Sequence, residues 1–166
     1  MKKLISISLI LLSLLLCMSA CNASYRDDQT AKQVADKMLA AINVAGGCTS
    51  VDSDYVSLEF PDADAVNASV SDWCIYPSTS SITVDELGVF HVKAGENVGA
   101  VKTAVEQYVQ SMQVKLEVYL DMYDPAEKSK LENAQVFVYG NYVIYTMLSE
   151  SDTAAVKSAA EALLKE

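Results

Sequence analysis

The sequence predicts an α+β fold, with a largely antiparallel four-stranded sheet and helices packed against it. Apolar residues recur at helical spacing over the long run Val98–Leu120. Two β-type runs lie within 136–148, and Gly140-Asn141 separates them as the two-residue turn of a hairpin. A second pair of β-type runs, 73–76 and 87–92, precedes the long helix.

The elements before the first strand pair are a helix and a strand. Apolar side chains from Val34 to Ile42 keep helical spacing, and Gly46-Gly47 are expected to end that helix. Residues 55–60 are expected to form a strand, because β-type residues precede the break at Pro61.

The elements after the first strand pair have clear boundaries. Asn97 is the expected N-cap of the long helix, and Asp124-Pro125 ends it and starts a shorter helix. Ser151 or Asp152 is expected to cap the last helix. A weak internal repeat, in which Ala100-Val101-Lys102 recurs as Ala155-Val156-Lys157, supports an α-ββα-ββα order.

The first 21 residues are typical of a secretory signal peptide of the bacterial lipoprotein class. Lys2-Lys3 give a positive start, an apolar run follows, and Ser19-Ala20 lead into Cys21, the expected site of lipid attachment. The apolar run spans roughly 20 Å as a helix, short of the ~30 Å hydrocarbon core, so a transmembrane anchor is the less favoured alternative. Simple secretion is the other alternative.

This interpretation divides the chain into three parts. Residues 1–20 are the signal peptide, residues 21–28 are a tether, and residues 29–166 are a single domain. Removal of residues 1–20 takes away two lysines and leaves 10 basic against 22 acidic side chains, a net charge of −12. Nucleic acid and anionic lipid head groups repel such a surface, so nucleic acid is not an expected partner.

Cys48 and Cys74 are the two cysteines that remain after lipidation of Cys21. An even pair in an exported chain is compatible with a disulfide, and two reduced thiols are the alternative. A zinc site is not expected, because His91 is the only histidine and no cysteine pair has ligand spacing. The sequence predicts no cofactor.

Catalytic patterns are sparse. His91 lies in an apolar strand without a nucleophile nearby, and a structural role is expected for it. The acidic pairs at 52 and 54 and at 62 and 64 could supply carboxylates for acid–base chemistry or calcium binding. Solvated loop charges are the more ordinary interpretation of both pairs.

Strand 142–148 is apolar on both of its faces, with Tyr142 on one and Tyr145 on the other. A sheet covered on one side only should alternate apolar with polar residues. Either helices cover both faces, or a protein partner or second copy of the chain covers one of them. The second alternative makes Tyr142 or Tyr145 an interaction surface.

A family resemblance is carried by the following motifs: Asp85-Glu86-Leu87-Gly88-Val89-Phe90, the long helix with Ala100-Val101-Lys102 and with Tyr119 near its end, Leu131-Glu132-Asn133-Ala134, and Gly140-Asn141-Tyr142-Val143. With them, residues 30–165 resemble a family of small uncharacterised lipoproteins of low-GC Gram-positive bacteria, a domain of unknown function. The resemblance implies a signal peptide, a lipid anchor and one compact α+β domain. It implies no activity, ligand or catalytic residue.

The function expected from the sequence is that of a lipoprotein anchored on the extracytoplasmic face of the bacterial cell membrane, with a non-catalytic binding or assembly domain. One alternative is an envelope or glycan hydrolase that uses acidic residues. Another is a substrate-capturing lipoprotein associated with a transporter, although 146 residues are few for a two-lobed receptor.

Overall fold

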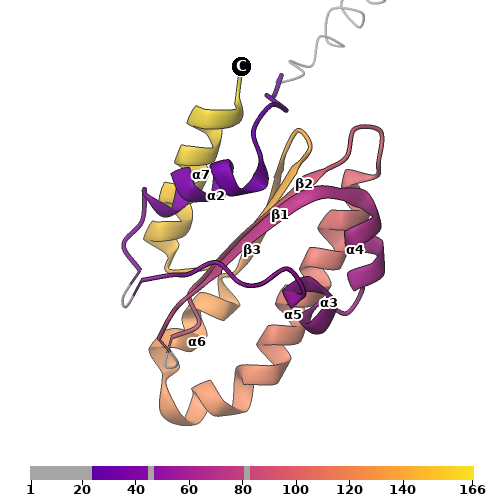
Figure 1. Cartoon of the computed structure of the whole chain (residues 1–166). Helices are drawn as coiled ribbons and strands as arrows, with labels where there is room; N and C mark the ends of the chain where they lie inside the picture. The colour runs from indigo at the N-terminus through magenta and orange to yellow at the C-terminus, as the bar shows by residue number, and fades with distance from the viewer. Residues whose placement is uncertain (1–23, 45–46, 81–82) are drawn as a thin grey trace, which may run out of the picture.

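The computed structural model describes residues 24–44, 47–80 and 83–166, so the predicted signal peptide and Cys21 lie outside the described residues. The described helices are α2 (Ala31–Leu39), α3 (Tyr55–Glu59), α4 (Ala63–Ser69), α5 (Val98–Tyr123), α6 (Pro125–Glu132) and α7 (Glu150–Leu164). The described strands are β1 (Val70–Pro77), β2 (Glu86–Val92), β3 (Gln135–Tyr139) and β4 (Tyr142–Met147). The strands form one antiparallel sheet in the order β1-β2-β4-β3, which confirms the α+β fold (Figure 1).

Helices cover both faces of the sheet. Helices α2 and α7 pack on one face, where Ile144 of β4 is fully buried. Helices α3 to α6 lie on the side of the other face, where Tyr145 is fully buried beneath α5 (Figure 1). The apolar character of both faces of β4 therefore reflects coverage by the chain itself.

Side-chain caps set the starts of α2, α5, α6 and α7. Thr30 and Gln33 form a capping box before α2, and Asn97 accepts a hydrogen bond from the backbone N–H of Ala100 at the start of α5. Ser149 caps α7, so the prediction of Ser151 or Asp152 as cap is wrong by two to three residues. The capping oxygen of Ser149 accepts from the N–H of Asp152, which places Asp152 inside the first turn.

The β3–β4 hairpin has the predicted two-residue turn. Tyr139 and Tyr142 pair across its end, and Gly140 adopts a φ of +57° that favours glycine. A Cβ atom on Gly140 would also come within 2.8 Å of the Cβ of Tyr25. The glycine thus allows both the turn and the close approach of the N-terminal segment.

The predicted strand at 55–60 is instead the short helix α3, followed by α4. Val56 and Phe60 are four residues apart, so one helical turn directs both into the core beside Phe90. Packing against the sheet decides the conformation of this segment, which β propensity alone misassigns. The first helix also ends at Leu39, well before Gly46-Gly47.

The order of strands and long helices follows the predicted α-ββα-ββα arrangement, but the two hairpin–helix units are not a symmetric duplication. Strands β2 and β4 are antiparallel neighbours, so a twofold axis that exchanges them would be perpendicular to the sheet. Such an axis would leave α5 and α7 on the same face. They pack on opposite faces.

Residues 24–28 are docked on the domain. The backbone N–H of Arg26 donates to the carbonyl of Leu164 at 2.8 Å, and that of Glu166 donates to the carbonyl of Ser24 at 3.0 Å. The ring of Tyr25 packs edge-on against Tyr139. The predicted tether at 21–28 is therefore wrong from Ser24 onward. Within the described part of the chain, no helix combines the length and apolarity needed to cross a membrane.

Candidate functional site

A buried carboxylate with three tyrosine partners lies at the end of the sheet where β2 begins. Glu86 is the first residue of β2. Tyr108 donates from its hydroxyl to Glu86 Oε1 at 2.8 Å, Tyr55 donates to Oε2 at 3.3 Å, and Tyr145 also donates to Oε1. The hydroxyl oxygens of Tyr55 and Tyr108 are 3.0 Å apart. The cluster joins β2, α3, α5 and β4 through one side chain.

Burial dominates the electrostatics of this cluster. It raises the pKa of Glu86, while the three tyrosine hydroxyls act in the opposite direction. Burial and the neighbouring Glu86 carboxylate raise the pKa of both Tyr108 and Tyr145, which therefore stay protonated donors. Because these hydroxyls already point at the carboxylate, the cluster is suited to holding elements together rather than to attacking a substrate.

An ion-pair group attaches α6 to the same end of the sheet. Lys130 Nζ lies 2.8 Å from Asp85 Oδ2 and 2.7 Å from Glu127 Oε1. The other oxygen of Glu127 accepts from the backbone N–H of Val84 at 2.8 Å. Burial acts to lower the pKa of Lys130, but the two carboxylates outweigh it and the net direction is upward.

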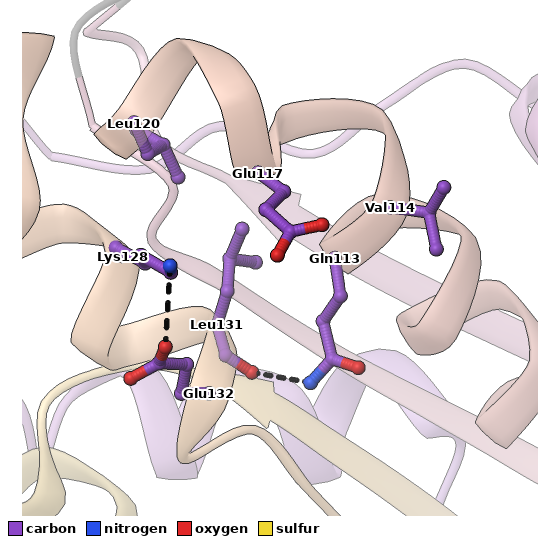
Figure 2. A pocket seen from close by; sticks show the side chains of 7 residues that line it. All are labelled: Gln113, Val114, Glu117, Leu120, Lys128, Leu131 and Glu132. Atoms are coloured by element: carbon purple, nitrogen blue, oxygen red, sulfur yellow. Dashed lines mark hydrogen bonds and ion pairs between the residues drawn. The ribbon is translucent and has the colours of Figure 1, made fainter. Parts of the chain in front are cut away.

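Two hollows adjoin Leu120 of α5. One, of about 150 Å³, lies over the start of β2 and includes Glu86 and Met112 in its lining. The other, of about 310 Å³, lies between α5 and α6. We call it the α5–α6 groove; its lining is Gln113, Val114, Glu117, Leu120, Lys128, Leu131 and Glu132 (Figure 2).

The α5–α6 groove has an apolar floor with polar groups at its edges. Gln113 Nε2 donates to the carbonyl of Leu131 at 2.7 Å and so ties the two helices together (Figure 2). Lys128 and Glu132 form an ion pair at 3.6 Å along α6. The carboxylate of Glu117 extends into the space between the two helices (Figure 2).

An exposed apolar line runs along α5 beside this groove. Val114, Val118 and Met122, which we call the α5 stripe, are 71%, 71% and 68% exposed. Their spacing of four residues places them on one side of the helix, while Leu120 on the other side is buried. Three exposed apolar side chains that are neighbours on one side of a helix make this line a candidate binding surface.

The α5 stripe was not predicted from the sequence. The apolar line through Val101, Val105 and Tyr108 accounts for the buried side of α5. Val114, Val118 and Met122 form a second line at four-residue spacing, and an amphipathic helix with one buried side does not need it. That surplus of apolar residues in the second half of α5 is the signal that could have identified the stripe.

The predicted interaction surface at Tyr142 and Tyr145 is wrong, because both side chains are fully buried. Tyr142 stacks on His91 and donates to the carbonyl of Gln29 at 2.5 Å. Tyr145 donates to Glu86 beneath α5. Their hydroxyls satisfy internal polar groups, so tyrosine content on this strand reports packing and not exposure.

Cys48 and Cys74 are free cysteines in the structure. The segment that starts at Cys48 runs along β1, with Cys48 opposite Ser78 and the N–H of Val51 donating to the carbonyl of Ile75. In this register Cys48 is four residues away from Cys74 along the strand, roughly 13 Å. A disulfide needs Cα atoms within about 7 Å, so of the two alternatives the arrangement favours two reduced thiols.

His91 has a structural environment. Its Nε2 lies 2.8 Å from Asp27 and its Nδ1 lies 3.4 Å from Asp72. The acidic pairs at 52, 54 and at 62, 64 are exposed at the starts of α3 and α4. Among the residues that the structure describes, no group of three or more histidine, cysteine or acidic side chains is placed to hold a metal ion.

Comparison with known families identifies the family of this chain. A family profile described as Domain of unknown function (DUF4358) matches residues 66–148, half of the chain. The chain belongs to the DUF4358 family. The DUF4358 segment runs from within α4 to just beyond β4 and contains the α5 stripe and the α5–α6 groove, whereas α2, α3 and α7 lie outside it. No curated protein and no solved structure matches the chain.

Proposed function

We propose that this DUF4358 protein is a lipoprotein anchored through Cys21 on the extracytoplasmic face of a bacterial cell membrane. Its domain binds a partner protein and does not catalyse a reaction. The observation that carries the binding role is the α5 stripe, three large apolar side chains exposed side by side on one helix. The anchor is supported by the signal-peptide pattern that ends at Cys21.

The energetics of the stripe suit an interface. Burial of a Val or Met side chain contributes about 1.5–3 kcal/mol, so three of them supply several kcal/mol toward association before its entropic cost. The adjoining α5–α6 groove adds Leu120 and Leu131 as an apolar floor that a partner side chain could reach. A rigid helix also loses little conformational entropy on binding.

The buried acidic side chains are bound by other side chains of the same domain. This supports a binding function over that of a hydrolase. Glu86 accepts from three tyrosines, and Asp85 pairs with Lys130. A general acid or base must reach a substrate proton directly or through one water. Both carboxylates are already hydrogen-bonded or ion-paired to side chains of the domain, so neither is placed to exchange a proton with a substrate.

Photocrosslinking in native membranes tests the binding role. A photoreactive amino acid at Val118 should give a discrete adduct with a partner, and one at the exposed Ala154 of α7 should not. Replacement of Val114 with Gln should then weaken the adduct formed from position 118, with the melting temperature nearly unchanged because the side chain is exposed. Absence of an adduct from position 118, or equal adducts from both positions, would contradict the proposal.

The anchor has its own test. Mass spectrometry of the mature N-terminus should find a diacylglyceryl group on Cys21, and Cys21→Ala should release the protein from membranes or block its maturation. An unmodified mature N-terminus at any other residue would contradict the anchor while leaving the α5 stripe open to the crosslinking test.

A further inference from the structure

The N-terminal segment is held against one end of the sheet. Asp27 pairs with His91 at 2.8 Å and accepts from Asn141 Nδ2 at 3.0 Å. The backbone bonds of Ser24 and Arg26 to the C-terminal residues fix the start of the segment. We call this the near end of the domain; it carries the start of the described chain, drawn in indigo (Figure 1).

The distance from the near end to the proposed lipid is short. Cys21 precedes Ser24 by three residues, and an extended chain spans at most ~3.6 Å per residue. The backbone between Cys21 and Ser24 can therefore span no more than roughly 11 Å. With Ser24 bonded to the domain, the anchor leaves little freedom for the domain to move away from the bilayer.

The α5 stripe lies toward the opposite end. Helix α5 begins at Val98, after the turn that follows β2, and its 26 residues extend for about 39 Å. Its second half and α6 lie at the far end of the domain, where Lys130 pairs with Asp85 at the start of β2 (Figure 1). From Val98 to Val118 the rise along the helix is about 30 Å.

Charge opposes a tilt that would lay the domain on the membrane. The mature chain carries a net charge of −12, and exposed aspartates at 52, 54, 62 and 64 lie at the starts of α3 and α4. Anionic lipid head groups repel the face of the domain that carries α3 and α4. The short anchor keeps the near end next to the bilayer, and the repulsion opposes the approach of the face that carries α3 and α4.

We infer that the near end of the domain is the membrane-facing surface and that α5 stands away from the bilayer, presenting its stripe to a partner outside the membrane. This orientation rests on the proposed lipid anchor at Cys21. It deepens the proposed function, because it makes the partner a water-soluble or wall-side protein and not a membrane-embedded one.

Energy transfer to the membrane surface tests the orientation. The full-length lipidated protein is reconstituted in vesicles of phosphatidylcholine and phosphatidylglycerol with an acceptor dye on outer-leaflet head groups. A fluorescent amino acid replaces Glu96, in the turn before α5, or Ala126, at the start of α6; both side chains are exposed and lie outside the stripe. Transfer from position 96 should be at least twofold stronger than from position 126.

A second variant and a flotation measurement separate the outcomes. A flexible insertion of about 20 residues between Asn22 and Ala23 should leave flotation with vesicles unchanged and remove most of the difference in transfer. Flotation with equal transfer from the two positions, or stronger transfer from position 126, would overturn the orientation alone. Failure of the lipidated protein to float would overturn the anchor and the orientation together.

Discussion

Gly88 lies directly beneath the ring of Tyr145. The two residues are paired across β2 and β4, and a Cβ atom on Gly88 would lie 2.6 Å from Cζ and 2.8 Å from Cδ1 of that ring. Only a residue without a side chain lets the ring lie over the strand and direct its hydroxyl to Glu86. The position of the buried carboxylate cluster thus depends on a glycine two residues along the same strand.

Gly88→Ala should lower the free energy of unfolding by about 2 kcal/mol, because the added methyl group displaces the Tyr145 ring from a close-packed core. Chemical denaturation of the two proteins measures the change. Gly99→Ala in α5 is the matched control, since the nearest atom to its added Cβ, Asn97 Oδ1, lies 3.1 Å away and no aromatic ring covers the position. That control should change stability by much less.

A double-mutant cycle checks the cause of the effect. Tyr145→Leu removes the ring from Gly88, so Gly88→Ala in that background should be milder than in the original protein by about 1 kcal/mol or more. Equal effects of Gly88→Ala in the two backgrounds would mean that the ring is not the source of the strain.

Glu86→Gln should change the pH dependence of stability. Burial raises the pKa of Glu86 above its ordinary value of 4.5, so the folded protein holds this proton more tightly than the unfolded chain. The stabilisation that Glu86 gives through this tighter proton binding is fully present below pH 4.5. It is lost as the pH rises through the pKa of Glu86 in the folded protein. Relative to the original protein, the variant should therefore gain stability between about pH 5 and about pH 8.

Urea denaturation at the two pH values gives this difference. Glu96→Gln is the control, because Glu96 is exposed and its replacement should leave the difference near zero. A constant offset between Glu86→Gln and the original protein at both pH values would contradict a raised pKa for Glu86 in the folded state.

The parts of the fold that the sequence predicted well have local causes. The helix from Val98, capped by Asn97, and the turn at Gly140-Asn141 depend on residues close together in the chain. The alternation of Ile144 and Tyr145 between the sheet faces follows from strand geometry alone. Each of these features could be argued without knowing what packs against it.

The features that were missed depend on tertiary neighbours. The 55–60 segment is helical because Val56 and Phe60 meet the core together. The burial of Tyr145 and Glu86 depends on α5 lying over the sheet, and the docking of residues 24–28 depends on contacts with residues more than 100 positions away. The α5 stripe is the exception, since its spacing was visible in the sequence.

Thiol reactivity should distinguish Cys48 from Cys74. Both cysteines should be found reduced, and Cys48, which is partly exposed, should be alkylated first. Burial and the nearby carboxylates of Asp85 and Glu86 raise the pKa of Cys48 to about 11, so its alkylation should be slow near neutral pH and rise about tenfold per pH unit. Peptide mapping by mass spectrometry after timed alkylation assigns each rate.

The buried Cys74 should react at the rate of unfolding, and both thiols should react rapidly in denaturant. Cys48→Ser should remove the faster reaction and leave the slower one unchanged. Recovery of a Cys48–Cys74 disulfide peptide from unreduced protein would contradict the described register between Cys48 and Ser78.

Asp27→Asn should loosen the N-terminal segment while leaving the core intact. Asp27 binds His91 and Asn141, and an amide in its place loses the charge that both contacts use. Hydrogen exchange at the backbone N–H groups of Arg26 and Glu166 should become several-fold faster, because these groups are protected only while the segment is docked. Exchange in β2 and β4 should not change.

Asp28→Asn is the matched control for this measurement. Asp28 is exposed and pairs with Arg26, two residues away in the same segment, so its loss should leave the docking in place. Equal acceleration in Asp27→Asn and Asp28→Asn would mean that general charge, and not the contact with His91, holds the segment. Such a result would also remove the fixed near end from which the orientation of the domain at the membrane is argued.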